Sequence, residues 1–419
     1  MKEWSIKELE EWDEKIGVIA AALGLDWYPI DYEICDYREM IGHMAYTGLP
    51  THYRHWSYGK AFDRIQTEYN LGMSGLPYEM IINSMAHCVG HSDFFKNNHM
   101  FADTGAGTVL ARFKAASKRI KKYMEDPHIG VEKVEKILDA CHTIRYQVPR
   151  APGIKQRTHK ELLKHYQKLV INDKSGKWDN FDLNKIPLET DSNLLRFIAN
   201  YNRFLEEWEK DIINIVEQES LYFIPQALTK IMNEGWAVLI HEKIIKALKL
   251  PDKYHLAFIR LHNQVVRPHL GGMNPYHLGY KIFRHIEETQ GFQECLRARE
   301  TNNDESFIKA YLTEELCKEM NLFSYSFHQK ESYNRITEVS GEDSWRTVRD
   351  DLIKNVGLNS IPVILVKELQ RDGTLILEHE HDGRDLELSE ANKVFRHINE
   401  LWGGGVRFTT VIEDDIWEF

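Results

Sequence analysis

Apolar residues recur three or four positions apart over most of the first 290 residues of the chain. This spacing is typical of amphipathic helices that pack one face against a core. It predicts helices at residues 2–24, 108–124, 131–143, 190–220, 224–248, 252–264 and 276–289. Pro225 is expected to open the helix at 224–248, because proline suits the first turn of a helix.

Two stretches do not follow this pattern. Residues 27–98 are rich in aromatic residues, histidine and glycine, which predicts short helices joined by tight loops. Between residues 148 and 189 the periodicity weakens around several prolines and a polar run. We interpret residues 148–189 as a long connection or surface excursion and not as a domain of its own.

The last 90 or so residues change in character. β-Branched runs predict strands at residues 361–367, 374–380 and 406–412, with a capped helix at 389–401. The expected fold is therefore mainly α. A helical core domain, residues 1–330, is followed by a small α+β domain, residues 331–419.

Length and charge narrow the classes of function. A chain of 419 residues exceeds what a single core usually holds, so more than one domain is expected. The net charge of −11 argues against nucleic acid or an anionic membrane as the main partner, because both bind concentrated basic surfaces. No apolar run is long enough to predict a membrane span, and the first residues lack a signal-peptide pattern.

Cysteine usage bears on the compartment. The five cysteines are scattered, odd in number and never arranged as CxxC. Disulfides and a thiolate zinc site are therefore not expected, and a cytoplasmic location is. Histidine is the unusual count, with 20 residues, many of them in dense local groups.

His87 and His91 are the best candidates for metal ligands. Four residues rotate a helix by about 400°, so both imidazoles project from one face. Glu234 is the candidate third ligand, since it lies in the apolar run 231–239, where an unpaired carboxylate is costly to bury. The sequence predicts one divalent transition metal, with zinc expected and iron or manganese as alternatives. A buried salt bridge is the alternative for Glu234.

This ligand set resembles that of the gluzincin metallopeptidases. Residues 233–237, Asn-Glu-Gly-Trp-Ala, look like the glutamate-helix motif of that clan's aminopeptidases, so gluzincin-like ligand helices are expected. Cys88 departs from the clan's HExxH pattern, because it stands where the general-base glutamate would be.

Further side chains are candidates for proton transfer or support. Glu79 or His241 would take the proton, His241 lying two helical turns beyond the glutamate ligand and lining the same cleft. Asp93 is placed to orient an imidazole. His55 and His277 are candidates for the cleft, with structural roles as the alternative.

Long motifs over nearly the whole chain resemble the stage V sporulation protein R (SpoVR) family. The resemblance implies a role in endospore formation when the spore cortex is laid down, in the cytoplasm of the mother cell. Because such proteins also occur in bacteria that form no spores, a role in the cortex alone is not general. The matching segments are residues 28–33, 52–60, 75–79, 87–91, 94–98, 230–237, 274–279 and 382–384.

The chain departs from the family pattern at Ser84 and Met85, which are adjacent here, whereas the family carries a further segment between them. Gly271-Gly272 also replaces the more usual Gly-Arg.

Three hypotheses follow from these residues. The first is a metal-dependent hydrolase that cleaves an amide or peptide bond, with peptidoglycan-related material as a candidate substrate. The second is a non-catalytic scaffold or regulatory protein in cortex assembly, with a structural metal and protein partners. The absence of the HExxH glutamate favours it. The third is a redox site that holds iron or manganese.

Overall fold

The computed structural model describes residues 6–31, 78–153, 156–172, 175–176, 178, 181–268, 273–328, 333–339 and 344–419. These residues are mainly helical and end in a small sheet with one further helix, as the sequence predicts. They form two compact units: residues 6–31, 78–103 and 225–360 in the first, and residues 104–224 and 361–419 in the second. The domain boundary near residue 330 stays a prediction.

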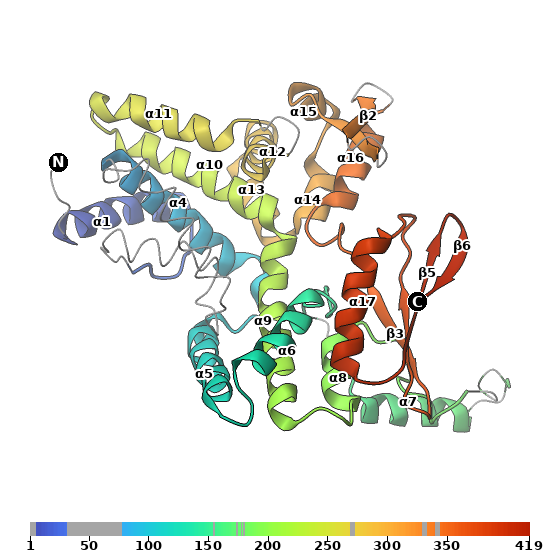
Figure 1. Cartoon of the computed structure of the whole chain (residues 1–419). Coiled ribbons are helices and arrows are strands. Elements are labelled where there is room, and N and C mark those ends of the chain that lie inside the picture. Colours follow the sequence, from blue (N-terminus) through green and yellow to red (C-terminus); the bar gives the residue numbers. More distant parts are fainter. Residues whose placement is uncertain are drawn as a thin grey trace. The chain divides into compact units, whose positions relative to one another are not determined.

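Helix α10 (Lys230–Leu248) is the central element of the first unit. Helices α4 (Tyr78–Asn97) and α12 (Pro275–Gln290) pack along it (Figure 1). A helix that is apolar on all sides belongs inside a core, and most of α10 is buried. Around this centre lie α1 (Ile6–Ala22), η1 (His99–Phe101), α11 (Asp252–Val266), α13 (Phe292–Thr301), α14 (Asp304–Tyr311), α15 (Glu314–Glu319), α16 (Trp345–Asn355), β1 (Phe323–His328) and β2 (Tyr333–Val339).

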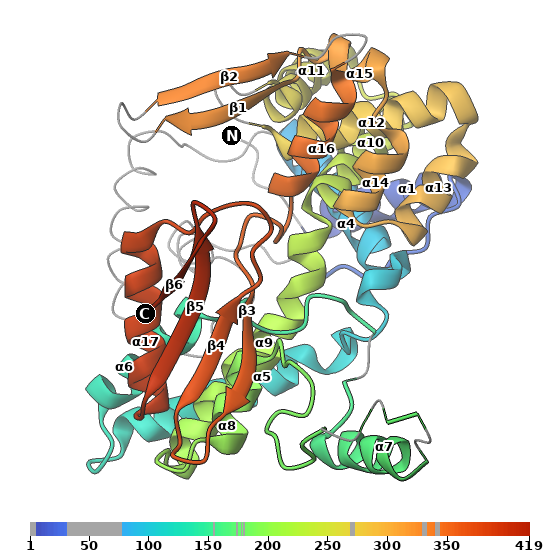
Figure 2. The same cartoon turned by 90° about the vertical axis from the view of Figure 1, so that its right-hand side faces the viewer.

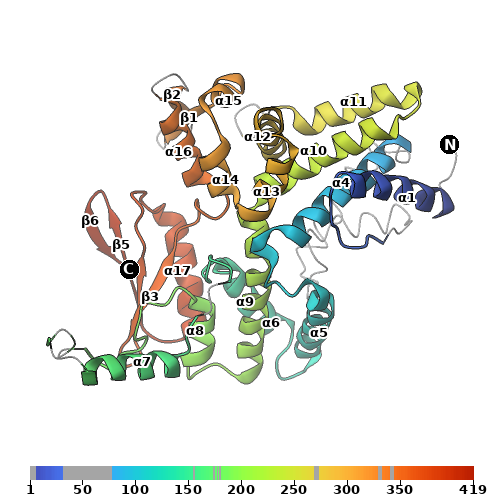
Figure 3. The same ribbon diagram turned by 180° about the vertical axis from the view of Figure 1, so that it is seen from behind.

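Glycines allow the three central helices to approach closely. A Cβ atom on Gly90 of α4 would lie only 2.7 Å from the Cα atom of Ala237 in α10. A Cβ atom on Gly235 of α10 would lie 2.4 Å from the Cα atom of Gly279 in α12. Because no side chain separates the backbones, α4 and α12 lie close beside α10 (Figure 3).

The N-terminus of α10 is capped from a distant part of the chain. The buried carboxylate of Asp304 accepts hydrogen bonds from the backbone N–H groups of Ile231 (2.9 Å) and Met232 (2.8 Å). These donors have no partner within their own helix, so the carboxylate satisfies groups that would otherwise be buried unpaired.

The prediction that Pro225 opens this helix is wrong. Pro225 lies inside the last turn of α9 (Glu207–Leu228), and α10 begins only at Lys230. The Thr229 hydroxyl donates to the Pro225 carbonyl at 2.6 Å, between the two helices. Beyond the first turn, a proline removes one i→i−4 hydrogen bond and its ring crowds the carbonyl four residues earlier, so Pro225 is consistent with a helix that ends three residues later.

The second unit holds a four-stranded sheet in the order β3-β4-β5-β6. β3 and β4 are antiparallel, β4 and β5 are parallel, and β5 and β6 are antiparallel. Helix α17 connects β4 to β5 and packs beside β5 (Figure 2). The bounds are β3 (Ile364–Leu369), β4 (Leu375–His379), α17 (Leu388–Trp402), β5 (Val406–Ile412) and β6 (Asp415–Glu418). The predicted strands and helix are therefore present, and β6 is an addition.

The remaining helices of the second unit are α5 (Ala106–Glu125), α6 (Val131–Thr143), α7 (His159–Asn172) and α8 (Leu194–Tyr201), with the first part of α9. The single helix expected at 190–220 is divided, because the Asn202 side chain donates to the carbonyls of Leu401 and Trp402 at the end of α17. Helix α7 lies in the stretch interpreted as a connection and has no buried residue.

The sequence predicts neither disulfides nor a membrane span, and both can be examined in the described part of the chain. Cys88, Cys141, Cys295 and Cys317 form no disulfide bond with one another, and Cys35 lies outside the described residues. Among those residues, no helix is both long enough and apolar enough to cross a membrane.

Candidate metal centre

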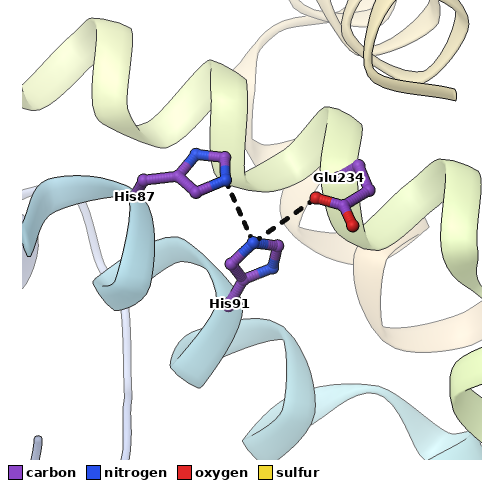
Figure 4. A group of neighbouring side chains, drawn as sticks. All are labelled: His87, His91 and Glu234. Carbon is purple, nitrogen blue, oxygen red and sulfur yellow. Dashed lines mark hydrogen bonds and ion pairs between the residues drawn. The ribbon is translucent and has the colours of Figure 1, made fainter. Parts of the chain in front are cut away.

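Helices α4 and α10 bring the three predicted ligands together. The Nε2 atoms of His87 and His91 are 3.0 Å apart, and Nε2 of His91 lies 3.5 Å from Oε2 of Glu234 (Figure 4). One ligand atom from each residue lies within 4.8 Å of the others. The two histidines are half-buried and Glu234 is buried.

These spacings suit a single ion. Nitrogen and oxygen ligands about 2.0–2.1 Å from a tetrahedral zinc ion lie about 3.3 Å from one another. The separations of 3.0 Å between the two Nε2 atoms and 3.5 Å between His91 Nε2 and Glu234 Oε2 bracket that value. In addition, Oε2 of Glu234 is buried and has no hydrogen-bond partner among the residues that the structure describes. A metal ion between this oxygen and the imidazole nitrogen that it faces would satisfy the unpaired carboxylate.

The other oxygen of Glu234 is already engaged. Lys230, one helical turn earlier on α10, forms an ion pair with Oε1. Burial, the charge of Glu234 and a hydrogen bond to Glu234 raise the pKa of Tyr276, which lies at the start of α12. The carboxylate is thus held on one side and left open toward the histidines on the other.

Each imidazole is held through the ring nitrogen that faces away from the centre. Nδ1 of His91 lies 2.8 Å from Oδ1 of Asn233, so this nitrogen carries the proton and donates. The Nε2 atom of His91 then carries a lone pair that can bind an ion. Nδ1 of His87 lies 3.0 Å from Nδ1 of His241. Such partners fix the orientation of metal-binding histidines.

A row of imidazoles leads away from the centre. Nε2 of His241 lies 3.1 Å from Nδ1 of His262 in α11. Burial, followed by the neighbouring charge of His91, lowers the pKa of His87 to about 4. Burial also lowers the pKa values of His241 and His262. The three rings are therefore neutral at pH 7, the form in which histidine binds metals.

His241 and Glu79 are the two residues predicted to transfer protons. His241, which was expected to line the cleft, contacts His87 through Nδ1 of that ring, whereas His91 lies at Nε2 of the same ring. Glu79 lies on α4 two turns before His87, and its side chain is outside the described part of the structure.

The supporting candidates are placed as follows. Asp93 is buried and accepts hydrogen bonds from Trp236 Nε1 (2.8 Å) and Arg299 Nη1 (2.5 Å), which tie α4 to α10 and α13. His277 contacts the carbonyl of Val266 through Nδ1 at 2.7 Å. His55 lies outside the described residues.

Four contacting residues were not among the predicted ones: Asn233, Lys230, Tyr276 and His262. Lys230 could have been found, because lysine and glutamate four residues apart on a helix form ion pairs. Asn233 belongs to the motif at residues 233–237, but the motif does not indicate that its side chain contacts His91. Tyr276 and His262 come from other helices, and nothing in their local sequence indicates that they face α10.

Cys88 does not take the place of the missing base. Its side chain is exposed, whereas the flanking ligands are half-buried. The likeness to gluzincin ligand helices stays a prediction.

The chain was compared with known proteins. The family model described as "SpoVR like protein" matches residues 3–85 and 84–361, and the "SpoVR-like C-terminal domain" matches residues 361–413. The first match divides at Ser84 and Met85, although α4 runs through both residues without a break. This is the point at which the family pattern carries a further segment.

One relative is an uncharacterized protein, YcgB, of Escherichia coli strain K12. It is 28% identical over 479 residues, which cover 98% of this chain and 93% of the relative. The aligned length exceeds the 419 residues of this chain, so the relative has additional residues inside the alignment. No solved structure matches. Because the family models match nearly the whole length, the chain belongs to the SpoVR family.

Proposed function

We propose that His87, His91 and Glu234 bind one divalent transition metal, with zinc the best fit, and that the centre hydrolyses an amide or peptide bond. The observation that carries the proposal is Oε2 of Glu234, which is buried, has no hydrogen-bond partner in the described part of the chain and lies 3.5 Å from Nε2 of His91. Two nitrogens and one carboxylate oxygen form the donor set of many catalytic zinc sites.

Three protein ligands leave a coordination position for substrate or water. When bound, the ion would polarise a carbonyl and lower the pKa of water, which is the chemistry that amide hydrolysis needs. Iron or manganese also suits these donors, so a redox site is the alternative for the identity of the ion.

The chain's own residues supply orientation. Asn233 and His241 hold the two imidazoles, and Lys230 holds the carboxylate. A base must take a proton from the attacking water. Glu79 is our first candidate. His241 is second, because both of its ring nitrogens already contact other histidines.

Elemental analysis of purified protein tests the metal site. Wild type is expected to carry about one transition metal per chain, and His87→Ala, His91→Ala and Glu234→Gln should each lose most of it. His255→Ala, an exposed histidine on α11, is the control and should keep its metal. Stoichiometric metal in the His87→Ala/His91→Ala double variant would show that the ligands are different residues.

Complementation separates an enzyme from a scaffold. Glu79→Gln should bind metal normally yet fail to restore function to a strain that lacks the gene, since loss of a general base slows a reaction about 10²–10⁴-fold. Full complementation by Glu79→Gln, with Glu234→Gln inactive, would exclude Glu79 as the base and make His241 the candidate. Complementation by metal-free variants would leave the scaffold hypothesis, which the exposed Cys88 in the usual base position favours.

The setting is proposed from the family. The name SpoVR connects it with sporulation, and we propose that this chain acts in the mother-cell cytoplasm when the cortex forms, with peptidoglycan-related material as a candidate substrate. Thiol trapping in sporulating cells should find the cysteines reduced. A stoichiometric disulfide would contradict a cytoplasmic location.

A further inference from the structure

The charges around the three ligands do not balance once an ion is present. Glu234 is the only carboxylate in the described ligand cluster, and its ion pair with Lys230 makes the pair neutral. Counted over the described side chains, a divalent ion between neutral imidazoles would therefore leave two excess positive charges. Excess charge in a half-buried site is costly unless an anion joins it.

One other carboxylate near Lys230, that of Asp304, does not supply that anion. Asp304 lies in the surroundings of Lys230, but it is buried and its oxygens accept the N–H groups of Ile231 and Met232. It is thus committed to the N-terminus of α10. This cap also fills the helix terminus, so backbone N–H groups there are not open to a ligand.

Lys230 can reach a ligand. Its side chain is 57% exposed, whereas that of Glu234 is only 6% exposed. An ammonium group has three N–H donors, and the hydrogen bond from Lys230 to Glu234 uses one of them. The remaining donors lie beside a carboxylate whose second oxygen faces the ligand histidines.

Tyr276 brings a second polar group close to the same carboxylate. Burial and then the charge of Glu234 raise the pKa of its hydroxyl, and its ring lies at 21° to the ring of His87 with centroids 6.3 Å apart. The Asn274 side chain accepts from the backbone N–H of Tyr276 at 3.0 Å, which fixes the start of α12. The surroundings of the carboxylate are therefore rich in donors.

We propose that the substrate carries an anionic oxygen group, a carboxylate or a phosphate, which Lys230 Nζ and Tyr276 Oη bind beside the metal ion. This inference rests on the proposed metal site and narrows its substrate class. For an amide hydrolase, the cleaved amide lies next to a free carboxylate or phosphate. A neutral amide of the same size is a poor ligand.

Cobalt-loaded protein provides the test, because the visible absorption of bound Co²⁺ changes when a ligand enters its coordination sphere. The protein is titrated with acetate, inorganic phosphate and neutral acetamide. Both anions, or one of them, should bind more tightly than acetamide, and the better anion identifies the group. Lys230→Gln should weaken anion binding about ten-fold or more at saturating Co²⁺, while Lys230→Arg retains it.

Lys246→Gln is the matched control. Lys246 lies on the same helix, is 59% exposed and pairs with the buried Glu242 at the same i,i+4 spacing, but it is remote from the ligands in sequence. It should bind anions as wild type does. Tyr276→Phe, which keeps the ring, is a second variant and should also weaken anion binding.

The outcomes are distinct. If Co²⁺ binds but Lys230→Gln and Tyr276→Phe leave anion affinity unchanged, the substrate class is wrong and the metal site stands. If acetamide binds as tightly as acetate, the proposed substrate class is likewise wrong and the metal site stands. If wild type binds no Co²⁺, the metal site and the inference both fail.

Discussion

At the scale of single residues, the orientation of each ligand depends on one neighbour. Asn233 is the clearest case, because its Oδ1 atom accepts from Nδ1 of His91 and thereby leaves Nε2 free for an ion. Removing such a partner usually costs about 10–100-fold in metal affinity.

We therefore expect Asn233→Ala to lower zinc affinity about 10–100-fold, and Asn233→Asp, which keeps the acceptor, to retain or increase it. Competition with a chromophoric chelator measures both. Asn172→Ala, at the exposed end of α7, is the control. Equal affinities in Asn233→Ala and wild type would show that Asn233 does not orient the ligand.

The residue scale is also where sequence reasoning was most successful. His87, His91 and Glu234 were chosen from helical spacing and from a carboxylate in an apolar run, and the structure brings them together. For His241 the sequence predicts only that it lines the same cleft as Glu234. Its direct contact with His87 is not predictable, because spacing along one helix gives the distance between backbones and does not show which side chain of another helix reaches it.

At the scale of elements, the predicted helices and strands follow periodicity, whereas their ends depend on distant residues. The beginning of α10 is set by Asp304, which lies 73 residues beyond Ile231 in the chain. The division between α8 and α9 involves Asn202, which binds the end of α17. A local pattern contains neither contact, so Pro225 was misplaced.

The crossing of α10 and α12 leads to a stability prediction. Gly235→Ala should lower the free energy of unfolding by about 1–3 kcal/mol through overpacking, and should weaken metal binding by separating Glu234 from Tyr276. Gly107→Ala in α5 is the control, since nothing lies within 4 Å of an added Cβ, and it should stabilise by about 0.5–1 kcal/mol. Urea denaturation measures both. A neutral Gly235→Ala would contradict the close packing.

The cap of α10 leads to a prediction about pH. Burial raises the pKa of Asp304 from 3.8 to about 7. A folded-state pKa above the unfolded value gives a stabilising contribution that is full below about pH 4 and is lost as pH rises through about 7. The free energy of unfolding of wild type, relative to Asp304→Asn, should therefore fall between pH 4 and 7. A difference that does not vary with pH would refute this.

At the scale of the whole molecule, the residues of the metal site all lie in the first compact unit. A ligand stabilises only what must be folded to bind it, by about 2.7 kcal/mol at 100 times its dissociation constant. In hydrogen exchange, zinc should slow the amides of α4 and α10, and leave those of β4, β5 and α17 unchanged. Equal slowing in both units would mean that they open together.

The row of three imidazoles has a consequence for the positions of its protons. Without an ion, His91 donates through Nδ1, so its Nε2 must accept from Nε2–H of His87. Nδ1 of His87 then accepts from His241, and Nε2 of His241 accepts from His262. Every hydrogen bond in the row points inward.

An ion on Nε2 of His87 reverses that polarity. The proton of His87 must then sit on Nδ1 and be donated to His241, whose own proton moves to Nε2 and is donated to His262. Three tautomers switch while the number of protons on the row stays the same. Nitrogen-15 spectra of the imidazoles should therefore show half-exposed His262 exchanging its protonated nitrogen when zinc binds, so that a ring two hydrogen bonds from the ligand reports whether the centre is filled.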